Sequence, residues 1–120
     1  SKQGNAFIPE ISPGEHDAVF SKSVNSAFIG TGLEDFLRTE SIENLIIVGA
    51  TTDHCISTSV RMAGNLGFNV WLCEDAVYTH GKTFKGKYYE PDLLHEVQLA
   101  SLNSEFCRVA TVEKCLETFF

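Results

Sequence analysis

The sequence lacks the features that mark membrane, nucleic-acid-binding and exported proteins. No apolar run approaches the roughly 18–20 residues of a membrane-spanning helix. Lysine and arginine together number 9 against 16 aspartates and glutamates, so the net charge is −7 and no basic cluster offers a surface for nucleic acid. The first residues carry no signal-peptide pattern. We therefore expect a cytoplasmic protein with no membrane or nucleic-acid partner.

Metal-binding and disulfide patterns are also missing. The four cysteines form no C-x-x-C pair and no Cys/His spacing typical of a zinc site, and the histidines have no partner at metal-ligand spacing. The sequence thus predicts no metal and no other cofactor. Cys73, Cys107 and Cys115 lie in or beside apolar segments and are expected to pack in the interior. Cys55 differs from them because small and polar residues precede it.

What the chain does contain is a regular alternation of apolar segments, in a length that suits one domain spanning residues 1–120. The continuous apolar run ENLIIVGA suits a strand covered on both faces. Hydrophobic spacing predicts strands at 17–22, 43–50, 69–76 and 107–112, helices at 33–40, 55–66, 90–106 and 112–120, and irregular chain at 1–14 and 78–89. Strands alternating with helices imply βαβ units and a parallel sheet with helices on both sides.

The junction GATTDHC, residues 49–55, joins the apolar strand to the next helix. In parallel sheets the chemistry lies at the carboxyl ends of the strands, and this order places Cys55, Lys22 and Asp75 along one such edge. A helix start offers free N–H groups and the positive end of the helix dipole, and a nearby ammonium would further favour a thiolate. The same N–H groups suit an oxyanion. These are most of the requirements of thiol-based acyl transfer.

Each of these residues also has an ordinary structural explanation. A cysteine at a helix start is more often packed than catalytic, and a lysine at a strand end is more often solvated. Asp53 suits the first turn of a helix as a charge that complements its dipole. His54 is adjacent to Cys55 but points in a different direction on a helix, so it is not expected to serve as the base. Local features alone leave a packed and a reactive Cys55 both open.

The order of several motifs resembles a known family. A lysine is followed by SAFIGTGL, an apolar strand, GATTDHC, and EDA after the next strand. This arrangement is similar to that of the isochorismatase-like cysteine hydrolases, which include nicotinamidases, N-carbamoylsarcosine amidase-like enzymes and ureidoacrylate amidohydrolases. The resemblance implies an α/β fold, a three-layer α/β/α sandwich with a parallel, Rossmann-like sheet. It also implies assembly as a homodimer or homotetramer.

The resemblance assigns roles to individual positions. Cys55 matches the family's nucleophile, and Lys22 matches the lysine that polarises it. A cis peptide bond is implied between Ala50 and Thr51, with an oxyanion hole formed by the N–H groups of Thr51 and Cys55. Asp75 matches an aspartate that we interpret as structural. The family's catalytic aspartate, in a D-x-Q-like motif on its first strand, has no counterpart here, so we expect a domain that is incomplete at its N-terminus.

The sequence therefore predicts a hydrolase of a C–N bond in a small amide-like molecule, acting through a cysteine acyl-enzyme. One alternative is a catalytically incomplete family member that serves as a binding or assembly module. Another is an isochorismatase-type vinyl-ether hydrolase, against which Cys55 argues. The substrate is not determined by the sequence. Candidates for an apolar pocket are Phe28, Trp71, Tyr78 and Phe84.

Overall fold

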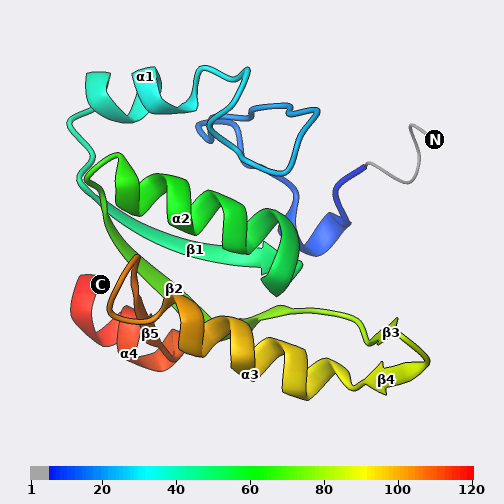
Figure 1. Ribbon diagram of the computed structural model, residues 1–120. Helices are drawn as coiled ribbons and strands as arrows, with labels where there is room; N and C mark the ends of the chain where they lie inside the picture. Colours follow the sequence, from blue (N-terminus) through cyan, green and yellow to red (C-terminus); the bar gives the residue numbers. More distant parts are fainter. Residues whose placement is uncertain (1–5) are drawn as a thin grey trace.

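A three-stranded parallel sheet forms the centre of the computed structural model, which describes residues 6–120 (Figure 1). Its strands are β1 (Asn44–Ala50), β2 (Asn69–Tyr78) and β5 (Arg108–Ala110), in the order β1-β2-β5. Residues 1–5, which belong to the segment predicted to be irregular, lie outside the described range. From residue 6 to residue 32 the only helical element is a short 3-10 turn at Pro9–Ile11.

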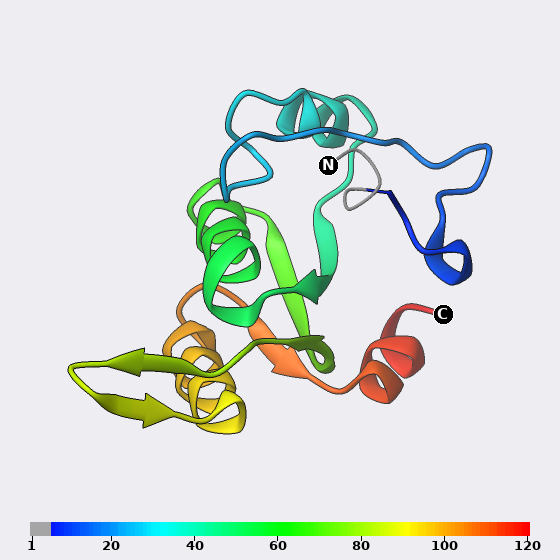
Figure 2. The same cartoon turned by 90° about the vertical axis from the view of Figure 1, so that its right-hand side faces the viewer.

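Helices cover both faces of this sheet. The chain forms α1 (Leu33–Thr39), α2 (Ser57–Asn65), α3 (Pro91–Leu102) and α4 (Val112–Phe119). Figure 2 shows α2 and α3 on one side of the sheet and α4 on the other. This arrangement confirms the predicted three-layer α/β/α sandwich. Within residues 6–120, no helix has the length and apolar character needed to cross a membrane.

Strand β2 explains why two separate cores form. Side chains along a strand alternate between the two faces of the sheet. Val70 and Leu72 enter the core that includes α2 and the end of α3, whereas Trp71 and Cys73 enter a smaller core with Cys115 of α4. All five side chains are buried. A strand that is apolar at consecutive positions is thus covered on both faces, and the predicted burial of Cys73 and Cys115 is confirmed.

Strand β1 is covered on one face only in the part of the chain that the structure describes. Leu45 and Ile47 pack against the larger core, but Ile46 and Val48 are 36% and 53% exposed. Within residues 6–120, the prediction that both faces of this strand are covered is therefore wrong. A continuous apolar run is compatible with two buried faces, but coverage depends on which elements pack there.

The predicted strand at 17–22 is absent. These residues are exposed and belong to no β-ladder within residues 6–120. Alternating apolar residues satisfy the sequence pattern of a strand, but a strand exists only when its backbone pairs with a neighbour. The segment instead follows the surface towards α1.

The predicted loop at 78–89 is a β-hairpin over most of its length. Strand β3 (Lys82–Phe84) pairs with β4 (Lys87–Tyr89), and the hairpin extends beyond the end of α3 (Figure 2). The connecting residues Lys85 and Gly86 have φ angles of 52° and 76°. Positive φ at both central residues is the geometry of the common two-residue hairpin turn, for which lysine is a weaker sequence signal than asparagine or aspartate. Prediction of an irregular loop here was wrong for that reason.

Two further boundaries differ from the prediction. Helix α3 ends at Leu102 rather than at residue 106, because Asn103 is extended and Ser104 has a φ angle of 75°. The helix predicted to begin at Cys55 begins as a wider turn, described below.

Candidate active site

Cys55 lies in a turn immediately after the carboxyl end of β1. Gly49 has a φ angle of 132°, a backbone conformation that residues with a Cβ atom rarely adopt. It lies beside an irregularity in the pairing of β1 with β2. The peptide bond between Ala50 and Thr51 is cis, at the position that the family resemblance implies. The chain then enters the turn that carries Cys55.

This turn is π-helical rather than α-helical. It spans Thr52–Ile56, and α2 proper begins at Ser57. The Thr51 carbonyl accepts hydrogen bonds from the N–H groups of His54 at 3.0 Å and Ile56 at 3.2 Å. An i to i+5 bond widens the turn, and such single wide turns are frequent at functional sites. The predicted α-helical start at Cys55 is corrected accordingly.

Lys22 lies against the sulfur of Cys55. Its Nζ donates a hydrogen bond to Cys55 Sγ at 3.1 Å and another to the Val24 carbonyl at 2.9 Å. Cys55 is half-buried, so its sulfur is partly removed from water while remaining accessible. The structure therefore brings together the two residues that the sequence singled out.

Asn25 also contacts the sulfur, and the sequence did not indicate it. The Cys55 thiol donates to Asn25 Oδ1 at 3.7 Å. A thiolate has no proton to donate, but rotation of the Asn25 amide would present its NH₂ group to the sulfur instead. This side chain is thus compatible with both states of the cysteine.

The segment that carries Lys22 and Asn25 is fastened to the helix that follows Cys55. Ser59 Oγ accepts from the Ala27 N–H at 3.0 Å, and Ser26 Oγ accepts from the Phe28 N–H at 3.1 Å. Ser59 lies one helical turn beyond Cys55, and Ser26 is only 1% exposed. The Ala27–Ser59 bond holds the Lys22 segment beside α2 without a β-ladder, and the Ser26–Phe28 bond stabilises a turn within that segment.

Two aspartates that were considered at this edge have other partners. Asp75 Oδ1 accepts from the N–H of Val112 at 2.9 Å, so it stabilises the start of α4 and does not contact the thiol. Asp53 accepts from the Thr79 hydroxyl at 2.6 Å and pairs with Lys82. It therefore ties the turn to the hairpin, and the interpretation of Asp53 as a mere first-turn charge misses this contact.

An apolar cavity of about 340 Å³ opens beside Cys55 and Lys22. Of the four aromatic residues considered for a pocket, only Phe28 lines it. Trp71 is buried in the core with α4, and Tyr78 and Phe84 are 57% and 64% exposed. The cavity is otherwise lined by Ala27, Leu33, Leu37, Leu45, Ile46, Ile47, Val48, Gly49, Ala50, Ile56 and Ser59.

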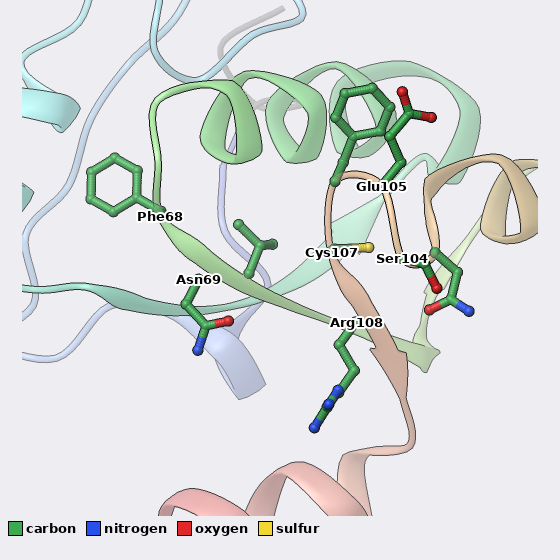
Figure 3. Close-up of a pocket in the computed structure, with 9 residues that line it drawn as sticks. Phe68, Asn69, Ser104, Glu105, Cys107 and Arg108 are labelled. Atoms are coloured by element: carbon green, nitrogen blue, oxygen red, sulfur yellow. The ribbon is translucent and has the colours of Figure 1, made fainter.

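A second cavity, of about 440 Å³, lies at the opposite end of the sheet, where β2 and β5 begin (Figure 3). Its lining includes Cys107 and Arg108. Burial raises the pKa of the Cys107 thiol to about 11, which makes this sulfur a poor nucleophile at neutral pH. Cavities at the amino ends of parallel strands are also not where such folds carry out chemistry. The cavity beside Cys55 is therefore the candidate active site. No cluster of three potential metal ligands occurs within residues 6–120.

Comparisons with known proteins identify the family of this chain. A family model described as the isochorismatase domain matches residues 1–114. The chain belongs to the isochorismatase family. Within this family it is 38% identical over 118 residues to the uncharacterised protein YrdC of Bacillus subtilis. It is 30% identical over 107 residues to the ureidoacrylate amidohydrolase RutB of Agrobacterium fabrum.

A solved structure of an isochorismatase-family protein from Chromobacterium violaceum superimposes with a TM-score of 0.91 at 43% sequence identity. The match covers 95% of this chain and 60% of that one. The YrdC match covers 98% of this chain and 63% of YrdC, and the RutB match covers 89% and 43%. The chain thus spans about two thirds or less of its isochorismatase-family relatives.

Proposed function

We propose that this protein is a cysteine hydrolase that cleaves a C–N bond in a small amide-like molecule. The observation that carries the proposal is the contact of 3.1 Å between Lys22 Nζ and Cys55 Sγ. At that distance an ammonium stabilises a thiolate, which is the nucleophilic form of cysteine. The likeness to a ureidoacrylate amidohydrolase supports a substrate with an amide or ureido group.

In the proposed reaction the Cys55 thiolate attacks the substrate carbonyl, and the carbonyl π electrons move to oxygen. The N–H groups of Thr51 and Cys55 stabilise this oxyanion, as free backbone donors at a turn do in acyl transfer. The oxyanion collapses, the C–N bond breaks, and the nitrogen leaves after gaining a proton. Water then attacks the thioester, and the carbon–sulfur bond breaks. This step releases the acid and regenerates the thiolate, while a proton from water returns to the group that protonated the nitrogen.

The leaving nitrogen needs a proton donor. Within residues 6–120 the hydrogen-bond partners of the Cys55 side chain are Lys22 and Asn25, and no carboxylate is among them. The family resemblance gives this step to an aspartate of a D-x-Q-like motif, which these 120 residues do not contain. A second candidate function, which requires no such proton donor, is a binding or assembly module that retains the fold without turnover.

Replacement of Cys55 by alanine tests the proposal. We expect Cys55→Ala to abolish hydrolysis of a panel of small amides and ureido compounds, measured as release of ammonia or amine, with the fold intact by circular dichroism. The matched control is Cys107→Ser, a thiol at the other end of the sheet, which should retain turnover. Turnover by Cys55→Ala would contradict the cysteine mechanism. Absence of turnover in the parent protein would favour the binding or assembly module.

Exposed apolar side chains bear on assembly. We propose a homodimer or homotetramer formed by a single domain, supported by exposed apolar side chains such as Val48 of β1 and Leu116 of α4, which are 53% and 52% exposed. The cytoplasmic location expected from the sequence stays a proposal. Sedimentation equilibrium would measure the assembly, and a monomer at micromolar concentration would contradict it.

A further inference from the structure

We propose that His95 of α3 is a positioning residue for the turn that carries Cys55. His95 lies 43 residues from Thr52, yet its Nδ1 is 2.9 Å from the Thr52 hydroxyl oxygen. Its other ring nitrogen, Nε2, is 3.0 Å from the carbonyl oxygen of Glu74 in β2. One imidazole therefore connects the turn, the helix α3 and the central strand. This role rests on the function proposed above.

The two contacts fix the direction of each hydrogen bond. A carbonyl oxygen only accepts, so Nε2 must carry the proton and donate to Glu74. In the neutral ring Nδ1 is then the acceptor, and the Thr52 hydroxyl donates to it. Thr52 is fully buried, so its hydroxyl would lose a hydrogen bond at a cost if His95 were removed.

A second contact holds the other end of the same turn. Ser57 Oγ donates to Gln98 Oε1 at 3.4 Å and accepts from Arg61 Nε at 3.1 Å. His95 and Gln98 are three residues apart and so lie on one face of α3. Thr52 and Ser57 stand on either side of Cys55 in the sequence. Helix α3 thus fixes the turn at both ends through polar contacts, and the His95 contact is the shorter of the two.

The position of Thr52 indicates what this contact does. Thr52 follows Thr51 directly, and the N–H groups of Thr51 and Cys55 are the proposed oxyanion donors. Loss of the His95 contact would let the Thr51–Thr52 end of the turn move and misplace the Thr51 donor, whereas Cys55, three residues beyond Thr52, is also held by Lys22 from the segment bonded to Ser59. His95 therefore supports stabilisation of the oxyanion and not formation of the thiolate, and these two effects are separable by experiment.

Two reactions of the full chain distinguish stabilisation of the oxyanion from formation of the thiolate. Iodoacetamide alkylates a thiolate by direct displacement, which forms no oxyanion. p-Nitrophenyl acetate acylates it through an oxyanion: the sulfur–carbon bond forms, and the carbon–oxygen bond breaks to release p-nitrophenolate. This leaving group departs without a proton donor, so the test does not depend on a catalytic aspartate. Both rates are measured by stopped-flow absorbance or mass spectrometry at Cys55.

The variants are Thr52→Val, His95→Gln and His95→Asn, with His16→Gln, an exposed histidine, as control. We expect Thr52→Val and His95→Gln to slow acylation by about 10-fold to 100-fold, the range seen when a reacting group is slightly misplaced. Alkylation should stay within about twofold of the parent protein in every variant. His95→Asn should recover most of the acylation rate, because its amide oxygen reaches the position of Nδ1 and accepts from Thr52.

Three results would overturn the role of His95. Acylation could remain unchanged in Thr52→Val and His95→Gln, alkylation could fall together with acylation, or His95→Asn could behave like His95→Gln. Failure of the proposed function looks different, since the parent protein itself would then show no acylation at Cys55, and that result would remove the role of His95 as well.

Discussion

The four cysteines differ in the surroundings of their sulfur atoms. Cys73 and Cys115 face each other at 3.5 Å in the small core, and burial together with this neighbour raises the pKa of Cys73 to about 11. Cys55 instead has a lysine ammonium at 3.1 Å. The sequence separated Cys55 from the other three by its polar neighbours, but it gave no sign of Asn25 or His95, because a hydrogen bond between distant side chains leaves no periodic trace.

Replacement of Lys22 tests whether its ammonium group activates the Cys55 thiol. We expect Lys22→Met to slow alkylation of Cys55 by iodoacetamide at neutral pH by about tenfold or more, because an opposite charge at contact distance favours the charged form of a side chain. Lys87→Met, which removes an exposed hairpin lysine, is the matched control and should have no effect. Equal rates in the parent protein and Lys22→Met would show that the lysine does not activate the thiol.

Elements were predicted well where packing on the sheet decides them. The buried strand β2 and the helices α1 and α4 lie within a few residues of the predicted ranges because their apolar residues point to a core. The segments that failed are those whose structure depends on pairing or turn geometry, namely the absent strand at 17–22 and the hairpin of β3 and β4. Hydrophobic periodicity carries no information about a missing ladder partner.

Gly64 of α2 packs closely against the backbone of Phe106, so a larger side chain at this position is expected to destabilise the fold. A Cβ atom at Gly64 would lie 2.8 Å from the Phe106 carbonyl oxygen, which is too close for any ordinary contact. We expect Gly64→Ala to lower the free energy of unfolding by about 1–3 kcal/mol through overpacking, measured by urea denaturation. Asn65→Ala, exposed on the same helix, should change it by less than about 0.5 kcal/mol. Equal stability of the two variants would contradict the close contact.

For the molecule as a whole, buried thiols make stability depend on pH. The pKa values of Cys73 and Cys107 rise from 9.0 to about 11 on folding, so above pH 9 the unfolded chain loses these protons before the folded one does. The unfolded state then binds fewer protons, and stability falls as pH rises from about 9 to about 11. Below pH 9 both states are protonated and these thiols add no slope.

Urea denaturation between pH 9 and pH 11 measures whether stability falls as the pH rises. Lysine and tyrosine titrate in the same window, so the informative quantity is the difference between variants. Cys107→Ser keeps a donor for the Leu102 carbonyl but has no thiol to ionise. We expect its stability to fall less steeply between pH 9 and pH 11 than that of the parent protein. An identical slope would show that Cys107 ionises equally easily in both states.

The sequence by itself determined the alternation of strands and helices, the junction GATTDHC at a strand end, and the choice of Cys55 among four cysteines. These features are local, because a few consecutive residues specify apolar faces, a tight turn and free backbone donors. The tertiary structure decided that Lys22, 33 residues away, meets the sulfur, and that α3 holds the turn through His95. Those contacts arise from how whole segments pack against the sheet, and no short stretch of sequence encodes that packing.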